Sequence, residues 1–514
     1  MKRRTFLKTG AAAAVAGTVS TMRKTQAARV NRSGRRPNIL VFLTDDHGRW
    51  AQQPYGNPDV KTPNMSWLEE HGTKMTQAYT TCPVCSPARA SFFTGRMPSQ
   101  HGIQDWLYEP GHIYDNCLKG QTLISEPLKS AGYHTGLVGK WHCGATRFPK
   151  TAFDYWYSFW VWQYPHFGKQ NFSNQGKYLE EYGNQSHLLT NRALEFLKNS
   201  RAGRRKNREP FFLFVGYTDT HSPHIQAPKK YVDYYNRQPL NWFKVPPFAP
   251  CHGQIATLAN GVPRLASEQH ARLAEYYGAV ANIDDQVGRV ITALKDMGEL
   301  DDTMVVYTGD HGLNGGHNGF WEKGNATIPQ NFVDDSILIS SIVSWRNGGI
   351  KAGATSDAIV SHPDLFMTIL DVAKAHPGQA VMESINSPGL SYLRQLRGEK
   401  VSGWRDSIIC EYGNARMIRT DRYKLILRYP FDWVQAPNEL YDLQNDPHER
   451  INVYGKAAHQ GLIKDLSRKI NAFFKVYTVP GNSGLDLEKQ PTPNPQAPWI
   501  RMARRDTQWI VRDY

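Results

Sequence analysis

The chain has 514 residues, of which 40% are hydrophobic and 21% are charged, so it is long and apolar enough to bury a large core. Its formal net charge of +15 favours polyanionic partners such as sulfated or phosphorylated compounds. The sequence contains no arginine-rich helix, RNP-like run or zinc-finger spacing, so we expect no nucleic-acid partner.

Residues 1–28 are predicted to form a twin-arginine signal peptide. Arg3 and Arg4 stand together before a weakly apolar run over 9–22, and Thr25-Gln26-Ala27 offers small residues for cleavage. The run is too short and too weakly apolar to cross a bilayer, and no other transmembrane candidate follows. This interpretation predicts export of the folded chain by the twin-arginine machinery, to a bacterial periplasm or beyond. The alternative is a disordered basic arm.

Short apolar runs separated by amphipathic segments predict a doubly wound α/β sheet covered by helices. The predicted strands are 38–43, 135–138, 211–215 and 304–307. The predicted helices between them are 63–70, 86–94, 187–197 and 267–297.

Each predicted strand is followed by ionisable residues, and open α/β sheets bind ligands at the carboxyl ends of their strands. Asp45 and Asp46 follow the first strand, and Lys140-Trp141-His142 follows the second. His221 and His224 follow the third, and Asp310-His311 follows the fourth. Four such endings predict one functional site at this edge.

Three of these residues are carboxylates, which repel one another unless a cation lies between them. A cluster of Asp45, Asp46 and Asp310 favours a hard cation, Ca²⁺ or Mg²⁺, whereas zinc prefers more histidine or cysteine. His311 either joins these ligands or contacts the substrate. The alternative for Asp45 and Asp46 is that they cap the next helix.

The segment from Cys82 to Arg89 has two interpretations. Cys82 and Cys85 have the C-x-x-C spacing of a redox pair or half a metal knuckle, but no thioredoxin-sized unit and no second pair accompany them. In the other interpretation Cys85 is the N-cap of a helix with Pro87 in its first turn and Arg89 on the same face, a good position for an anionic nucleophile. The six cysteines do not define a disulfide framework.

Past Gly398 the pattern changes to short alternating runs over 406–411, 415–419, 423–428 and 438–443, followed by a helical segment over 457–474. We therefore predict a catalytic domain over 36–400 and a small antiparallel sheet with one helix over 401–480. The remaining segment, 481–514, is rich in Pro, Asn and Gln and predicts an irregular surface extension.

The run Cys85-Ser86-Pro87-Ala88-Arg89 resembles the C-x-P-x-R signature of the type I sulfatases. Other family elements are matched in family order between Pro37 and Asn452, and they are Asp45-Asp46, Gly139-Lys140-Trp141-His142, His221-Ser222-Pro223-His224, Asp310-His311-Gly312, Trp321-Glu322-Lys323-Gly324 and Glu439-Leu440-Tyr441-Asp442-Leu443. The resemblance implies an alkaline phosphatase-like fold with a large, mostly parallel sheet between helices.

In this family the signature cysteine is converted to formylglycine by a formylglycine-generating enzyme, and the hydrated aldehyde attacks the sulfur of a sulfate ester. The resemblance implies that Cys85 is this nucleophile, that Arg89 steadies it and that His142 is its base. It also implies that Lys140 and Lys323 bind sulfate oxygens, and that His221 with Lys323 protonates the leaving oxygen. The ligands implied for Ca²⁺, with Mg²⁺ as the alternative, are Asp45, Asp46, Cys85, Asp310 and His311.

The expected substrate is a sulfated carbohydrate. We expect His101, His224 and His317 either to line the substrate pocket or to bond the backbone, and three aromatic-rich connections to form pocket walls, namely 105–113, 159–182 and 241–262. One alternative is a phosphate or phosphonate ester hydrolase, because relatives with the same signature share the scaffold. Another is an inactive protein that binds sulfated glycans.

Overall fold

The computed structural model describes residues 36–107, 115–161, 165–207, 209–242, 254–255, 266–430 and 436–485. The predicted signal peptide and the extension beyond 485 lie outside the described residues, as does most of the predicted pocket wall over 241–262.

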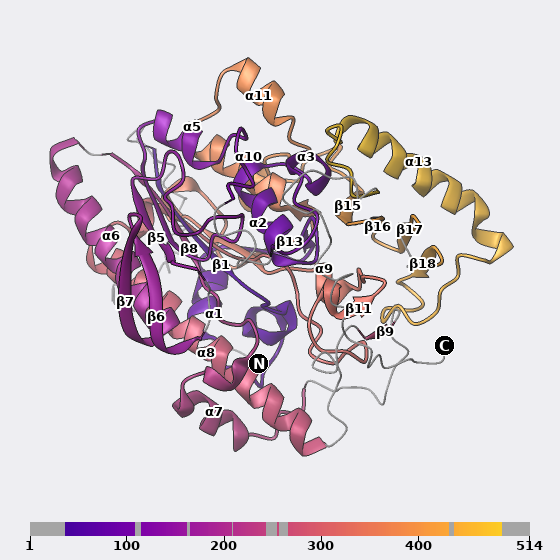
Figure 1. Cartoon of the computed structure of the whole chain (residues 1–514), viewed down its shortest axis with the longest axis horizontal. Helices are drawn as coiled ribbons and strands as arrows, with labels where there is room; N and C mark the ends of the chain where they lie inside the picture. The colour runs from indigo at the N-terminus through magenta and orange to yellow at the C-terminus, as the bar shows by residue number, and fades with distance from the viewer. Residues whose placement is uncertain are drawn as a thin grey trace, which may run out of the picture.

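A ten-stranded sheet forms the centre of the molecule (Figure 1). Its strands, in spatial order, are β13 (Ala354–Ser356), β2 (Thr73–Met75), β12 (Ser341–Ser344), β10 (Thr303–Gly309), β1 (Asn38–Thr44), β8 (Phe211–Gly216), β4 (His134–Gly139), β5 (Tyr155–Phe159), β6 (Phe167–Asn174) and β7 (Lys177–Asn184). Strands β12 and β6 run against their neighbours, and the other strands share one direction. The sheet is therefore mixed and mostly parallel, as predicted.

Helices cover both faces of this sheet because its central strands are apolar on both sides. In β1, Ile39 and Val41 pack into one core, whereas Leu40 and Phe42 pack into the core on the opposite face. The first face is covered by α2 (Cys85–Thr94), α5 (Ser125–Ser130), α10 (His362–Ala373) and α12 (Leu393–Leu396). The second face is covered by α1 (Pro63–Glu70), α6 (Gln185–Asn207) and α8 (Ala266–Asp296).

Short elements complete this domain. The remaining helices are α3 (Pro98–His101), α7 (Lys229–Asn236), α9 (Asp334–Ile337) and α11 (Gln379–Ile385). Two small pairings, β3 (Ala78–Tyr79) with β14 (Val360–Ser361) and β9 (Gln254–Ile255) with β11 (Thr327–Ile328), lie outside the main sheet. No helix within the described ranges combines the length and the hydropathy needed to span a membrane.

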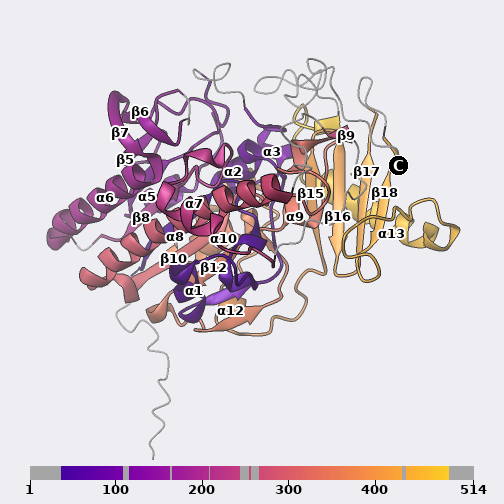
Figure 2. The ribbon, with the colours of Figure 1, turned by 90° about the horizontal axis from the view of Figure 1, so that it is seen from below.

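A separate four-stranded antiparallel sheet follows in the C-terminal part of the chain. Its strands are β15 (Ser407–Tyr412), β16 (Ala415–Thr420), β17 (Tyr423–Arg428) and β18 (Glu439–Asp442), and α13 (Gln460–Val476) packs on it. Figure 2 shows this sheet at one end of the molecule and the β6–β7 hairpin at the opposite end. The predicted sheet-plus-helix unit is thus present within 401–480.

The registers of the central strands bring four strand ends to one level. Thr44 pairs with Gly309, while Gly216 pairs with both Leu43 and Gly139. The residues that follow β1, β4, β8 and β10 therefore emerge side by side at the carboxyl edge of the sheet. This is the arrangement that the sequence predicted.

Candidate active site

Helix α2 places Cys85 at the centre of this edge. The helix begins at Cys85 itself, after an extended N-cap at Val84, so the predicted N-cap position was one residue too far along the chain. Cys85 is 2% exposed, and its Sγ lies 3.3 Å from Nε2 of His311. Cys82 is also a free thiol but packs in a different apolar cluster, so the structure separates the two cysteines of the C-x-x-C run.

Arg89 is buried one turn after Cys85 and ties three segments together. Its Nε donates to Oδ2 of Asp310 at 2.9 Å, and its Nη1 donates to the carbonyl of Lys140 at 3.0 Å. Its Nη2 lies 3.7 Å from Oδ2 of Asp45. The guanidinium fork thus fixes the ends of β1, β4 and β10 relative to α2.

The three predicted carboxylates converge on Cys85. Ligand atoms of Asp45, Asp310, His311 and Cys85 lie within 4.8 Å of one another, and Asp46 belongs to an overlapping group. All of these side chains are buried. Burial and the Asp45 carboxylate raise the pKa of Asp310 to about 7. Acidic groups that raise one another's pKa in a buried cluster are typical of a site that binds a cation.

His311 shows that these residues fit a hard divalent cation. Its Nδ1 donates to the Gly312 carbonyl at 2.9 Å, while burial and then the Lys323 ammonium hold its pKa well below the usual value, so the ring is neutral. Its Nε2 lone pair therefore faces Oδ1 of Asp46 at 3.3 Å and Oδ1 of Asp310 at 3.5 Å. Oδ1 of Asp45 has no hydrogen-bond partner among the described residues. Lone pairs that face one another in a buried site favour a cation between them.

Two lysines lie against these carboxylates. Nζ of Lys140 donates to Oδ2 of Asp45, and Nζ of Lys323 lies 2.5 and 2.6 Å from the two carboxylate oxygens of Asp46. Burial opposes the charge on Lys323, but the Asp46 carboxylate outweighs it and raises the pKa of the amine. The Lys323 ammonium therefore stays charged at neutral pH, and both amines lie against the carboxylates that converge on Cys85, where they can bind an oxyanion.

Two histidines each present one unprotonated nitrogen. Nε2 of His142 donates to the Leu107 carbonyl at 3.0 Å, and its buried Nδ1 has no partner among the described residues. Nδ1 of His221 donates to the Ser222 carbonyl at 2.7 Å, which leaves Nε2 to accept from Nζ of Lys323 at 3.1 Å. Burial and a neighbouring lysine lower both pKa values, so each ring is a neutral base.

The other three predicted histidines lie in different places. His101 is buried behind α2, where Nε2 meets Ser91 Oγ at 3.2 Å, and the structure does not bring it to the cluster. His317 pairs with Asp335 at 2.7 Å, also outside the cluster. His224 begins a short 3-10 helix three residues after His221, is 5% exposed and has no hydrogen-bond partner on either ring nitrogen among the described residues.

Tyr276 contacts the backbone next to the site, and no pattern in the sequence predicts this contact. Its hydroxyl donates to the Asp46 carbonyl and accepts from the Gly48 amide, both at 2.8 Å. Asp46 has a φ of +55°, a left-handed conformation that this double contact holds in place. In sequence, a tyrosine within a long amphipathic helix is predicted to be a core residue. Only the folded structure shows that its hydroxyl contacts Asp46 and Gly48.

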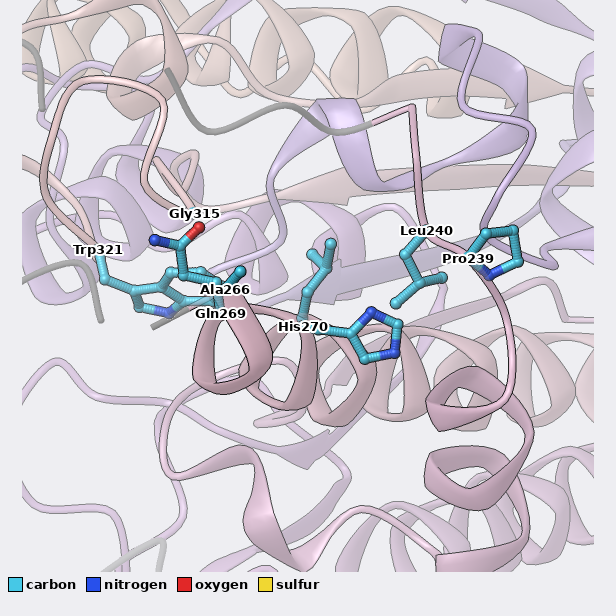
Figure 3. Close-up of a pocket in the computed structure, with 8 residues that line it drawn as sticks. Pro239, Leu240, Ala266, Gln269, His270, Gly315 and Trp321 are labelled. Atoms are coloured by element: carbon cyan, nitrogen blue, oxygen red, sulfur yellow. The ribbon is translucent and has the colours of Figure 1, made fainter. Parts of the chain in front are cut away.

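A cavity of about 200 Å³ lies at the start of α8, and His270, Leu273 and Trp321 are among the residues that line it (Figure 3). Trp321 packs edge-on against Tyr276, with ring centres 6.3 Å apart, and Lys323 follows two residues later. None of the catalytic candidates lines this cavity, so it adjoins the cluster without being part of it.

Two family models match the chain. The sulfatase model matches residues 37–375, and the C-terminal model of N-sulphoglucosamine sulphohydrolase matches 329–475. The chain belongs to the sulfatase family. This sulfatase is therefore a sulfuric ester hydrolase with the alkaline phosphatase-like fold, as the resemblance implied.

Several relatives of this sulfatase have named activities. An N-acetylglucosamine-6-O-sulfatase of Bacteroides thetaiotaomicron is 26% identical over 86% of this chain and 87% of its own length. An arylsulfatase of Clostridium perfringens is 26% identical over 85% of this chain and 93% of its own length. An ulvan-active sulfatase of Formosa agariphila is 26% identical over 85% and 80%.

Solved structures confirm the fold. A protein solved in complex with its substrate D-glucosamine-2-N,6-O-disulfate has a TM-score of 0.72 and 23% identity, with 86% of this chain and 98% of that chain covered. The phosphonate monoester hydrolase of Agrobacterium radiobacter has a TM-score of 0.64 and 20% identity, with 86% and 96% covered. The same fold therefore also occurs in an enzyme that is named for phosphonate esters.

Proposed function

We propose that this sulfatase hydrolyses a sulfate ester on a carbohydrate, with residue 85 as formylglycine and Ca²⁺ as its metal. The observation that carries the proposal is the position of the Cys85 side chain. It faces His311 where three carboxylates converge, and the amines of Lys140 and Lys323 lie against two of these carboxylates.

The residues divide into those that bind the sulfate group and those that move protons. Lys140 and Lys323 would bind its oxygens, and Arg89 would hold residue 85 in position through its bonds to Asp310 and the end of β4. His142 would accept a proton at Nδ1, because its Nε2 is committed to the Leu107 carbonyl.

The leaving oxygen would receive its proton from the pair of Lys323 and His221. The lysine ammonium already donates to Nε2 of His221, so a charged donor stands next to a neutral acceptor. The Lys323 ammonium, oriented by His221, would deliver its proton to the departing sugar oxygen, and the resulting neutral amine would take up a proton from water afterwards.

The two absent groups supply the remaining chemistry. Formylglycine supplies a hydrated aldehyde whose hydroxyl is the nucleophile. Ca²⁺, held by Asp45, Asp46, Asp310, His311 and residue 85, supplies a positive charge that polarises the sulfate, and Mg²⁺ is the alternative ion.

Support for a carbohydrate substrate comes from the relatives. One acts on N-acetylglucosamine-6-O-sulfate groups by name, another is named for ulvan, and a fold neighbour was solved in complex with a neocarrahexaose. The predicted leader over 1–28 supports export by the twin-arginine machinery to the periplasm or the medium, where such polymers are met.

The decisive experiment is mass spectrometry of the tryptic peptide Met75–Arg89, from protein made together with a formylglycine-generating enzyme, combined with steady-state rates. We expect residue 85 to have lost its sulfur and to react with a hydrazide. We also expect sulfate esters to react faster than matched phosphate and phosphonate esters. Two intact thiols in an active enzyme would overturn the formylglycine proposal, and a preference for phosphonates would overturn the sulfate assignment.

A matched variant separates catalysis from binding. Cys85→Ala should lose hydrolysis but still bind a sulfated glycan. If the wild-type protein shows only the binding, the chain is an inactive glycan-binding member of the family.

A further inference from the structure

The hairpin of β6 and β7 lies at one end of the molecule (Figures 1 and 2). Several of its aromatic side chains are exposed to solvent. Tyr182 is 76% exposed, Phe167 is 52% exposed and Tyr178 is 50% exposed. Phe148, in the loop before β5, is 46% exposed. Soluble proteins usually scatter exposed rings singly, so this grouping points to a binding surface.

The rings form two groups along one face of the hairpin. At the end near the sheet's carboxyl edge, Phe167 and Tyr182 meet edge-on with centres 6.0 Å apart. Toward the turn, Tyr178 meets Trp160 edge-on at 5.3 Å. Because Tyr178 and Tyr182 are four residues apart on one strand, the groups are separated by about 13 Å. A ligand that touches both is longer than one sugar ring.

Polar side chains fill the space between these two groups. Lys169 pairs with Glu180 at 2.6 Å, and the Tyr178 hydroxyl donates to Asn171 Oδ1 at 2.9 Å. Lys169 lies opposite Tyr182 in the register, and Asn171 lies opposite Glu180. The outward face carries rings, amides and charges but no aliphatic side chain, which distinguishes it from the apolar centre of a protein–protein interface.

A cation also lies beside the second group of rings. The guanidinium of Arg147 lies 4.8 Å from the ring centre of Phe148 and 5.4 Å from that of Trp160. Glu180 balances the charge of Lys169, so the positive charge beside the rings comes from Arg147, and it suits a sulfated ligand. Rings that stack on sugars and cations that meet sulfate groups are the chemistry of a sulfated polysaccharide site.

This face begins at the same edge of the sheet as the candidate active site. Strand β6 runs antiparallel to β5, so Phe167 lies at the carboxyl edge of the sheet. The preceding residue, His166, pairs with Asp219 at 3.2 Å, and Asp219 lies two residues before His221.

We infer that the outward face of the β6–β7 hairpin, defined by Trp160, Phe167, Lys169, Asn171, Tyr178 and Tyr182, is an accessory binding surface for a sulfated polysaccharide. This inference rests on the proposed function and extends it, because it makes the polymer, and not only a free sugar, the substrate. The surface holds the chain several residues away from the bond that is hydrolysed.

The test compares the double variant Tyr178→Ala/Tyr182→Ala with the control Tyr234→Ala, an exposed tyrosine on α7 that is 36% exposed. Affinity electrophoresis of the mature enzyme through gels containing heparin, ulvan, carrageenan or unsulfated dextran measures binding. Rates on 4-nitrophenyl sulfate measure the chemistry. For the sulfated polymer that retards the wild type most, we expect the dissociation constant of the double variant to rise about tenfold. The control should change by less than about twofold, and the aryl sulfate rate should change in neither variant.

Other outcomes overturn the inference. Equal polymer affinity in the double variant and the control would show that the hairpin does not bind the chain. Wild-type enzyme that binds no sulfated polymer would show the same. A change from dimer to monomer in light scattering of the double variant would assign the face to a second copy of the chain. Loss of polymer binding in an enzyme that hydrolyses no sulfate ester would leave this surface standing and refute the proposed function instead.

Discussion

Nζ of Lys323 lies 3.1 Å from Nε2 of His221, and the same amine contacts both carboxylate oxygens of Asp46. This lysine therefore connects the carboxylates proposed to bind the metal to the histidine proposed to face the leaving group. The carboxylate raises the pKa of the lysine, while burial and the lysine lower the pKa of the histidine. The lysine therefore holds the proton of the hydrogen bond between the two groups, and the histidine accepts that bond.

Replacing either member of this pair should harm poor leaving groups most. We expect His221→Ala to lower kcat/KM by about 10²–10⁴-fold for a sugar sulfate, which needs a proton on its departing oxygen. The loss for 4-nitrophenyl sulfate should be much smaller, because nitrophenolate departs without help. Steady-state rates on both substrates check this, and an equal loss on both would remove the proton-donor role.

Removing the metal should destabilise the enzyme as well as inactivate it. Asp45 and Asp310 lie close together, and without a cation between them their charges are balanced by Lys140, by Arg89 and by the His311 amide that donates to Asp310 at 2.9 Å. Ca²⁺ at a hundred times its dissociation constant should stabilise the fold by about 2.7 kcal/mol. Thermal unfolding after chelation and after return of Ca²⁺ measures this. The shift should vanish in Asp310→Asn, and a full shift in that variant would place the ion elsewhere.

A buried lysine in the C-terminal sheet should be important for stability. Nζ of Lys424 lies 2.7 Å from both Asp334 and Glu449, and it donates to the Phe332 carbonyl at 2.7 Å. Lys424→Met leaves the buried Glu449 and the partly buried Asp334 with less compensation, which should cost about 3–5 kcal/mol in unfolding free energy. Denaturant unfolding measures the change, with the exposed Lys469→Met as the control. A loss below about 1 kcal/mol would contradict this assignment.

Lys150 should make stability rise with alkaline pH. Its amine is buried near the rings of Trp141 and Trp156, and burial lowers its pKa from the usual 10.5 to about 8. Between these two pH values the unfolded chain binds a proton that the folded chain has released, so unfolding free energy increases with pH.

Lys150→Met should flatten this part of the profile. At neutral pH the variant should be more stable by up to about 3 kcal/mol, the value that the shift implies. Urea unfolding between pH 7 and 10.5 checks both statements. A parallel pH profile in the variant would show that another group titrates.

The strands, the strand-end residues and the small C-terminal sheet could be predicted from the sequence because each has a local signal. Apolar runs mark β1, β4, β8 and β10, and the residues after them reach one edge through the parallel register. The predicted helix over 187–197 was shorter than α6, which runs from Gln185 to Asn207, because its charged last turns carry no apolar stripe.

Features that depend on distant contacts were not predictable. The β6–β7 hairpin lay in a segment predicted as an irregular pocket wall, because its outward side chains alternate rings with polar groups. The sequence around His101 and His317 does not distinguish them from His221. Their partners, Ser91 and Asp335, are known only from the fold. The contact of Tyr276 with Asp46 joins residues 230 positions apart, so no local pattern records it.

The burial of Cys85 bears on the order of events in the life of the chain. The thiol is 2% exposed in the first turn of a helix whose residues are all buried, so a modifying enzyme cannot reach it after folding. If Cys85 is converted to formylglycine as proposed, its oxidation must be completed on the nascent or unfolded chain. If the predicted leader directs export of a folded protein, the sequence of events is modification, folding and transport. A chain that folds before Cys85 is modified would be exported in a folded but permanently inactive form. Slow early folding would therefore benefit this protein.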